Sequence, residues 1–198
     1  GIYTGTVSPS AAGTIGVAGA LLIALAGRRL TMSNFLDAVR RSVVTTASLF
    51  LIVIAGLIFS RLLLMTGAVG QLTDLINSGG YSVGVFIAGV VLAYLIVGMF
   101  IDPVSLMVIT IPLLYPTAKS LGIDPIWFGI LIVKLVEIGA ITPPIGINLF
   151  AVMSAAKPKI PSRDVFLGVL PFVLCELVVL GILIAFPIIS TYLVTGMR

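Results

Sequence analysis

The sequence predicts an all-α membrane protein whose transmembrane helices include a re-entrant helical hairpin and a broken, locally unwound helix. Of its 198 residues, 60% are hydrophobic and only 9% are charged, whereas ordinary soluble domains carry about 25% charged residues. The mean hydropathy is +1.29. The few charges stand in short clusters between long apolar runs, so we expect the chain to lie in a lipid bilayer.

The composition also excludes several classes of function. The net charge of +4 does not indicate nucleic acid, because the basic residues cluster at the ends of apolar runs, as membrane orientation signals do. The chain has no His and one Cys, and it has neither a Gly-x-Ser-x-Gly nor a phosphate-binding Gly-rich motif. We therefore expect no enzyme and no cofactor. Since it begins with Gly1, we expect a piece of a longer polypeptide.

Residues 1–80 predict scaffold-like transmembrane helices. One apolar run covers about residues 9–27, and a second covers 43–65, whose 23 residues include one charge. At about 1.5 Å per residue, the second run crosses a hydrocarbon core of about 30 Å. Between them, residues 33–42 have one apolar and one charged face, which predicts a short interfacial helix. Residues 66–80 predict a polar connection.

The next 38 residues, 81–118, contain a single charge, Asp102. A turn at 98–103 divides this run into arms of 17 and 15 residues, or about 25 and 22 Å of helix, each shorter than the ~30 Å core. The arm lengths therefore favour a re-entrant hairpin over two complete spans. Asp102 followed by Pro103 also suits the start of the second arm as a helix cap, a role that is compatible with a functional one.

Residues 125–156 form another long apolar segment, interrupted in its middle by Pro143 and Pro144. A proline has no N–H, so a helix through this point would lose hydrogen bonds to carbonyls such as that of Gly139. In a membrane, unwound backbone is tolerated only where it is buried in protein or lines a polar cavity. Freed carbonyls beside the Thr142 hydroxyl suit Na⁺. The alternative is a kink repaired by a neighbouring side chain.

Four further charges lie in or near apolar segments. Lys134 and Glu137 are three residues apart and share a helical face, which predicts an ion pair. It either braces two helices or takes a direct part in transport. Arg61 and Glu176 are expected to snorkel or to pack.

Residues 157–198 predict a basic cytoplasmic turn followed by a final transmembrane helix at 165 to about 192. The orientation rests on seven basic residues in two loops against Lys119 alone in the others. The seven are Arg28, Arg29, Arg40, Arg41, Lys157, Lys159 and Arg163.

Several motifs resemble the C-terminal half of the large membrane subunit of tripartite ATP-independent periplasmic (TRAP) transporters. They are GMFIDP at 98–103, IPLLYP at 111–116, LGIDPIWFG at 121–129 and TPPIGINLF at 142–150. The resemblance implies one inverted repeat of an elevator-type transporter. It implies import of organic acids such as C4-dicarboxylates or sialic acid, coupled to Na⁺, in a cytoplasmic (inner) membrane. Ala11 stands where the family often has a glutamate.

The resemblance also implies partners and a site. The partners would be a small membrane subunit, a periplasmic substrate-binding protein and the missing N-terminal repeat of the same polypeptide. The Na⁺ ligands would be backbone oxygens of Gly98, Gly139 and Ile145, together with Thr142. Residues expected to shape the site or meet the substrate are Asp102, Pro103, Ser105, Pro143, Pro144, Gly146 and Asn148. A membrane scaffold that assembles with partner subunits and transports nothing remains the alternative.

Overall fold

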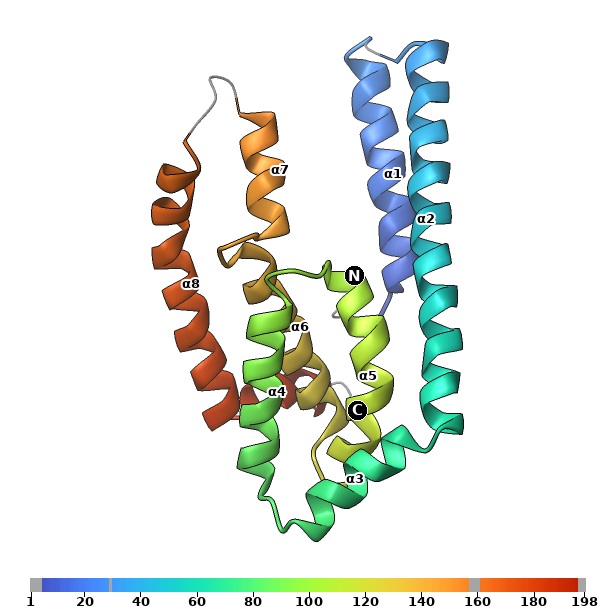
Figure 1. Cartoon of the computed structure of the whole chain (residues 1–198). Coiled ribbons are helices and arrows are strands. Elements are labelled where there is room, and N and C mark those ends of the chain that lie inside the picture. Colours follow the sequence, from blue (N-terminus) through green and yellow to red (C-terminus); the bar gives the residue numbers. More distant parts are fainter. Residues whose placement is uncertain (1–4, 29, 157–160, 196–198) are drawn as a thin grey trace. The chain divides into compact units, whose positions relative to one another are not determined.

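The computed structural model describes residues 5–28, 30–156 and 161–195, and every regular element in that part is an α-helix (Figure 1). Three of these helices, α1, α2 and α8, are long and apolar enough to cross a membrane. The chain divides into two compact units, Gly1–Phe50 and Leu51–Arg198. The helices are α1 Pro9–Ala26, α2 Met32–Met65, α3 Ala68–Ser78, α4 Val83–Val97, α5 Pro103–Ser120, α6 Pro125–Ile141, α7 Ile147–Ala155, α8 Ser162–Ala185 and α9 Ile188–Thr195.

The first unit holds α1 and the beginning of α2. Ser8 caps α1, since its Oγ accepts a hydrogen bond from the Ala11 N–H at 3.2 Å. The prediction of a separate short helix at 33–42 is wrong, because α2 runs without interruption from Met32 to Met65. No proline occurs within α2, so nothing in the chain breaks the hydrogen-bond ladder where the apolar run begins.

The second unit contains a helix, α3, where a polar connection was expected. Val69, Leu72 and Ile76 recur at the spacing of one helical face and are buried or partly buried, and α3 packs against α5. The Thr73 and Thr117 hydroxyls form a hydrogen bond of 2.8 Å across that contact. Thus α3 is an amphipathic helix, and its short apolar face was not recognised among the polar residues of the sequence.

Helices α4 and α5 form a helix–turn–helix around residues 98–102 (Figure 1). The turn ends at Asp102, whose Oδ1 accepts a hydrogen bond from the Ser105 N–H at 3.0 Å. Asp102 therefore caps α5, with Pro103 in its first turn. A hydrogen bond between the Tyr94 and Thr110 hydroxyls joins the two arms.

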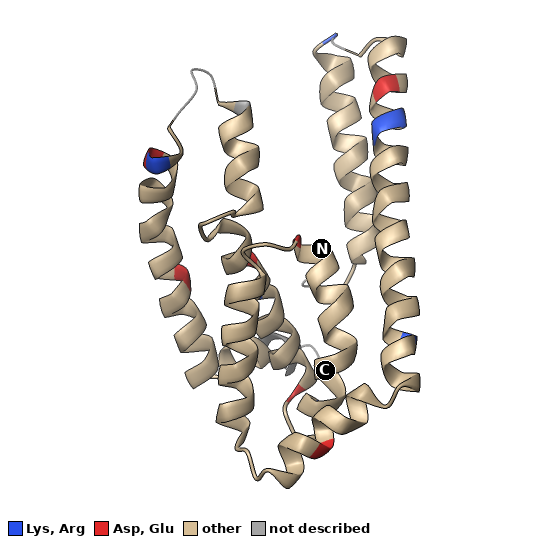
Figure 2. Cartoon of the chain, in the orientation of Figure 1, with Lys and Arg blue, Asp and Glu red and all other residues tan. Residues whose placement is uncertain are grey.

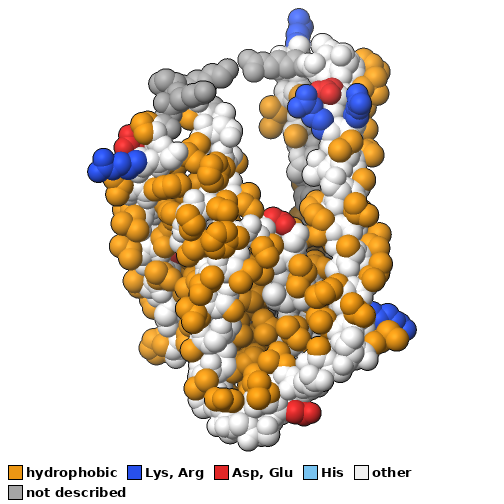
Figure 3. Space-filling view, viewed as in Figure 1, with side chains coloured by type: hydrophobic (Ala, Val, Ile, Leu, Met, Phe, Trp, Pro, Cys, Tyr) orange, Lys and Arg blue, Asp and Glu red, His pale blue; other side chains and the backbone are white. Residues whose placement is uncertain are grey.

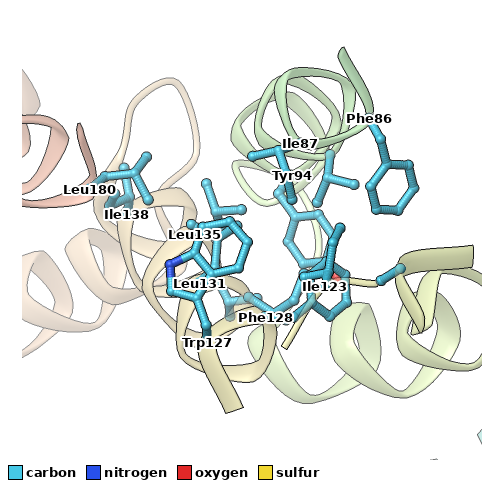
Figure 4. Packing of buried hydrophobic residues seen from close by; sticks show 14 of the residues in the cluster. Phe86, Ile87, Tyr94, Ile123, Trp127, Phe128, Leu131, Leu135, Ile138 and Leu180 are labelled. Carbon is cyan, nitrogen blue, oxygen red and sulfur yellow. The ribbon is translucent and has the colours of Figure 1, made fainter. Parts of the chain in front are cut away.

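Helix α6 lies at the centre of the second unit, against α4, α5 and α8. Its Leu131, Leu135 and Ile138 side chains are almost completely buried, and Figure 4 shows Leu135 and Phe128 packed beside Tyr94 of α4. The Phe86 and Phe128 rings stack with their centroids 6.3 Å apart. In lipid the hydrophobic effect hardly drives helix association, so this close van der Waals fit holds the unit together.

The final transmembrane helix ends earlier than predicted, at Ala185, and α9 begins after Pro187. Pro187 has no N–H to donate to the Leu183 carbonyl four residues earlier. The indole Nε1–H of Trp127 on α6 donates to that carbonyl instead, at 2.8 Å. The break between α8 and α9 is therefore compensated by a side chain from another helix.

The surface fits a bilayer. Charged residues are sparse along the helices (Figure 2), and apolar side chains are spread over much of the face of the second unit seen in Figure 3. Many large apolar side chains are well exposed, among them Leu92, Phe172 and Val178. Such exposure would be a liability in water, but it is ordinary for helices in contact with lipid. The basic residues Lys157 and Lys159 lie outside the described residues.

Candidate functional site

The turn between α4 and α5 touches the end of α6 through two glycines. A Cβ atom placed on Gly139 would lie 2.8 Å from the Cα and 2.9 Å from the carbonyl carbon of Gly98. A Cβ atom on Gly98 would in turn lie 3.2 Å from the Gly139 Cα, and 2.5 Å from the Tyr94 carbonyl oxygen of its own helix α4. No side chain fits at either position, so the two backbones meet directly.

A short non-helical segment, 142–146, follows this contact and separates α6 from α7. Thr142 has extended backbone, with φ −89° and ψ 129°, and the Pro143–Pro144 peptide bond is cis. Gly146 adopts the left-handed region at φ 53°, which favours glycine. Its carbonyl accepts a hydrogen bond of 2.7 Å from the Leu149 N–H at the start of α7.

Thr142 ties the break back to α6. Its hydroxyl donates to the Ile138 carbonyl at 2.5 Å, and its N–H donates to the Gly139 carbonyl at 3.1 Å. The prediction that the prolines leave the Gly139 carbonyl free is therefore wrong. The carbonyl keeps a second lone pair for another partner. Ala140 is four residues before Pro144, which has no N–H to offer it.

Comparison with known proteins assigns this chain to a family. Residues 1–189 match the family model described as "Tripartite ATP-independent periplasmic transporter, DctM component". The chain belongs to this family. Its members are components of transporters and not enzymes, as the sequence predicted.

Curated TRAP large permeases match almost all of the chain. It is 32% identical to the ectoine/5-hydroxyectoine TRAP transporter large permease protein UehC of Ruegeria pomeroyi, over 98% of this chain and 45% of that protein. It is 31% identical to the C4-dicarboxylate TRAP transporter large permease protein DctM of Pseudomonas aeruginosa, over 96% of this chain and 44% of that protein. It is 29% identical to the sialic acid TRAP transporter large permease protein SiaM of Vibrio cholerae, over 94% of this chain and 44% of that protein. The chain spans less than half the length of these relatives.

Of the other residues that the sequence predicted for the site, only some lie close to one another. Ser105 and Pro103 are partly buried next to the Asp102 cap. Ile145 and Asn148 are exposed. Within the described ranges, no hydrogen bond connects Ile145 or Asn148 to the 98–102 turn. The structure thus brings together Gly98, Gly139 and, through its hydrogen bonds, Thr142.

The ion pair on α6 has a third member. Lys134 Nζ lies 2.9 Å from Glu137 Oε2 and also contacts the Glu176 carboxylate of α8. The sequence predicted that Glu176 snorkels or packs, and it did not predict this ion pair. The position of Glu176 deep in its helix was a sequence signal for such a partner. It lies fourteen residues after the start of α8, or about 21 Å along the helix. A charge there needs a partner.

Proposed function

We propose that this chain is part of a sodium-coupled secondary transporter of the TRAP type that imports an organic acid across the cytoplasmic membrane. Its partners would be a small membrane subunit, a periplasmic substrate-binding protein and the remainder of the large permease. The family match supports this proposal, as do relatives named for C4-dicarboxylate, sialic acid and ectoine transport.

The contact between Gly98 and Gly139 is the observation that carries the proposal. It sets the 98–102 turn against the last helical turn before the 142–146 break. Secondary transporters commonly bind coupling ions where interrupted helices meet near the middle of the membrane, because unwound carbonyls provide oxygen ligands there. Two glycines at this point let the backbone oxygens approach a shared ion.

Thr142 is suited to such an ion. Because its hydroxyl hydrogen is donated to the Ile138 carbonyl, the oxygen lone pairs remain available to a cation. The second lone pair of the Gly139 carbonyl would be another ligand, with backbone oxygens at Gly98 and Ile145 completing the proposed set. A neutral set of carbonyls and one hydroxyl suits Na⁺ better than Ca²⁺ or Mg²⁺, which usually recruit carboxylates.

Helix lengths support a re-entrant hairpin. Helix α4 has 15 residues and α5 has 18, which correspond to about 22 and 27 Å against a core of about 30 Å. Both arms would therefore end inside the membrane at the 98–102 turn. The clustering of basic residues in the other loops supports entry from the periplasmic side. With the broken α6–α7 pair, this hairpin would form one inverted repeat of an elevator-type transporter.

The substrate would lie near the turn and the break. Ser105 and Asn148 offer polar side chains to a carboxylate, while Pro103, Pro143, Pro144 and Gly146 would shape the backbone around it. Asp102 is engaged in capping α5, so we assign it no direct contact with Na⁺.

Reconstitution of the full-length permease with its small subunit and binding protein in liposomes tests the proposal. We expect uptake of an organic acid that requires an inward Na⁺ gradient and stops when the gradient is collapsed. Uptake that is indifferent to Na⁺ would contradict sodium coupling. Absence of any uptake by a folded, complete assembly would favour the scaffold alternative.

A further inference from the structure

Three charged side chains of α6 and α8 in the second unit meet in one cluster, and their charges do not balance. In their ionised forms Lys134 contributes one positive charge and Glu137 and Glu176 contribute two negative charges, so the cluster carries a net charge of −1. Glu137 is twelve residues into α6, or about 18 Å from the helix start. This depth places the cluster well inside a bilayer, where an unmatched charge is costly.

Glu137 is the member of the cluster that faces outward. Its side chain is 56% exposed, whereas those of Lys134 and Glu176 are 20% and 28% exposed. Among the residues that the structure describes, Lys134 is the one base in ion-pair contact with either glutamate. The unmatched negative charge is therefore presented at the surface of α6.

An open stripe on α6 leads to this carboxylate. Ile126, Gly129, Val133 and Glu137 are all exposed and recur at the spacing of a single helical face. A groove of about 390 Å³ runs along the first part of the stripe, lined by Pro125, Ile126, Gly129, Ile130, Val133 and Lys134. A Cβ atom on Gly129 would meet no atom within 4 Å. Small residues of this kind let a second helix approach closely in a membrane.

We propose that a membrane-spanning helix from the part of the same polypeptide outside these 198 residues packs along this stripe and sets one Lys or Arg against Glu137. The occupant must be a helix, because backbone in lipid has to satisfy its own hydrogen bonds. A Lys or Arg on this helix would match the negative charge that Lys134 leaves unpaired. Relatives of the family are more than twice as long as this chain, and a permease of that length would have further segments to supply it.

Two other occupants fit the charge less well. Lipid acyl chains would fill the apolar groove but would leave the charge of Glu137 unmatched. A second copy of the chain packed on the same face would bring two clusters of charge −1 together, which repel each other.

Photocross-linking in the full-length permease in its native membrane tests the proposal. A benzophenone amino acid replaces Val133 in the stripe, and Val178, an exposed residue of α8, serves as the matched control. We expect Val133 to give an adduct within the same polypeptide, to an apolar peptide that contains one Lys or Arg. Adducts at Val133 only to lipid, to another subunit or to a second copy would overturn the proposal, as would a peptide without a base.

A charge cycle then tests the pairing itself. We expect Glu137→Gln and replacement of the identified base by Gln each to lower the midpoint of thermal unfolding of the full-length protein. The double replacement should recover most of the loss, because neither charge is then left alone. Losses that simply add would contradict the pairing. The readout is stability, so this inference can fail while sodium-coupled transport stands.

Discussion

Gly98 and Gly139 approach so closely that a methyl group on Gly139 would lie 2.8 Å from the Gly98 Cα. The first glycine ends α4 and the second lies in the last turn of α6. The contact therefore couples the 98–102 turn to the 142–146 break without any side chain between them. A displacement of one segment would be transmitted directly to the other.

We predict that Gly139→Ala forces the turn and α6 apart. Overpacking of a tight contact usually costs about 1–3 kcal/mol, so the midpoint of thermal unfolding of the full-length protein should fall. Gly181→Ala on α8 is the matched control, because a Cβ atom there meets nothing within 4 Å. Its effect should be neutral or slightly stabilising, since alanine favours helix. Equal effects of the two substitutions on the unfolding midpoint would contradict a tight contact between Gly98 and Gly139.

We predict that Trp127→Phe weakens the junction of α8 and α9. The Leu183 carbonyl would lose the indole N–H that replaces the missing donor of Pro187, and a buried acceptor without a partner costs about 1–3 kcal/mol. Pro187→Ala restores a backbone N–H at the position where helix geometry needs it. The double variant should therefore be more stable than Trp127→Phe alone in thermal unfolding. If Pro187→Ala gives no recovery, the indole hydrogen bond is not the reason for the loss.

The proposed hairpin predicts that its turn does not reach the cytoplasm. Phe100 is exposed in the 98–102 turn, so Phe100→Cys can be tested with an impermeant thiol reagent after Cys175 and other native cysteines are replaced. We expect resistance to the reagent applied from the cytoplasmic side. Strong labelling from that side, irrespective of substrate and Na⁺, would instead indicate two complete spans.

Local sequence signals predicted the parts of the fold that depend on local chemistry. Asp102 and Pro103 form a recognisable start of a helix, and the structure shows that cap. The interruption near Pro143 follows from missing donors. In contrast, the continuity of α2 through residues 33–42 was missed, because an amphipathic stretch and an apolar run can share one helix when no residue breaks it.

Features that depend on the packing of distant segments could not be predicted from local sequence signals. Glu176 pairs with Lys134 only because α8 packs on α6 in a particular register. The hydrogen bond of Trp127 to Leu183 depends on the same packing. The engagement of the Gly139 carbonyl by the Thr142 N–H required the backbone geometry of the break. Periodicity within one segment carries no information about these partners.

The break at Thr142 is the proposed binding site of the coupling ion. Thr142→Ala removes the hydroxyl oxygen and the hydrogen bond to Ile138, while Thr142→Ser keeps both. The decisive measurement is the Na⁺ concentration for half-maximal uptake by the full-length transporter, at fixed substrate-loaded binding protein. We predict that it rises by about tenfold for Thr142→Ala, which corresponds to the loss of about 1.4 kcal/mol of binding free energy, and that Thr142→Ser stays close to wild type. An unchanged Na⁺ dependence in Thr142→Ala, with altered use of the substrate at saturating Na⁺, would contradict the claim and make the break a substrate site.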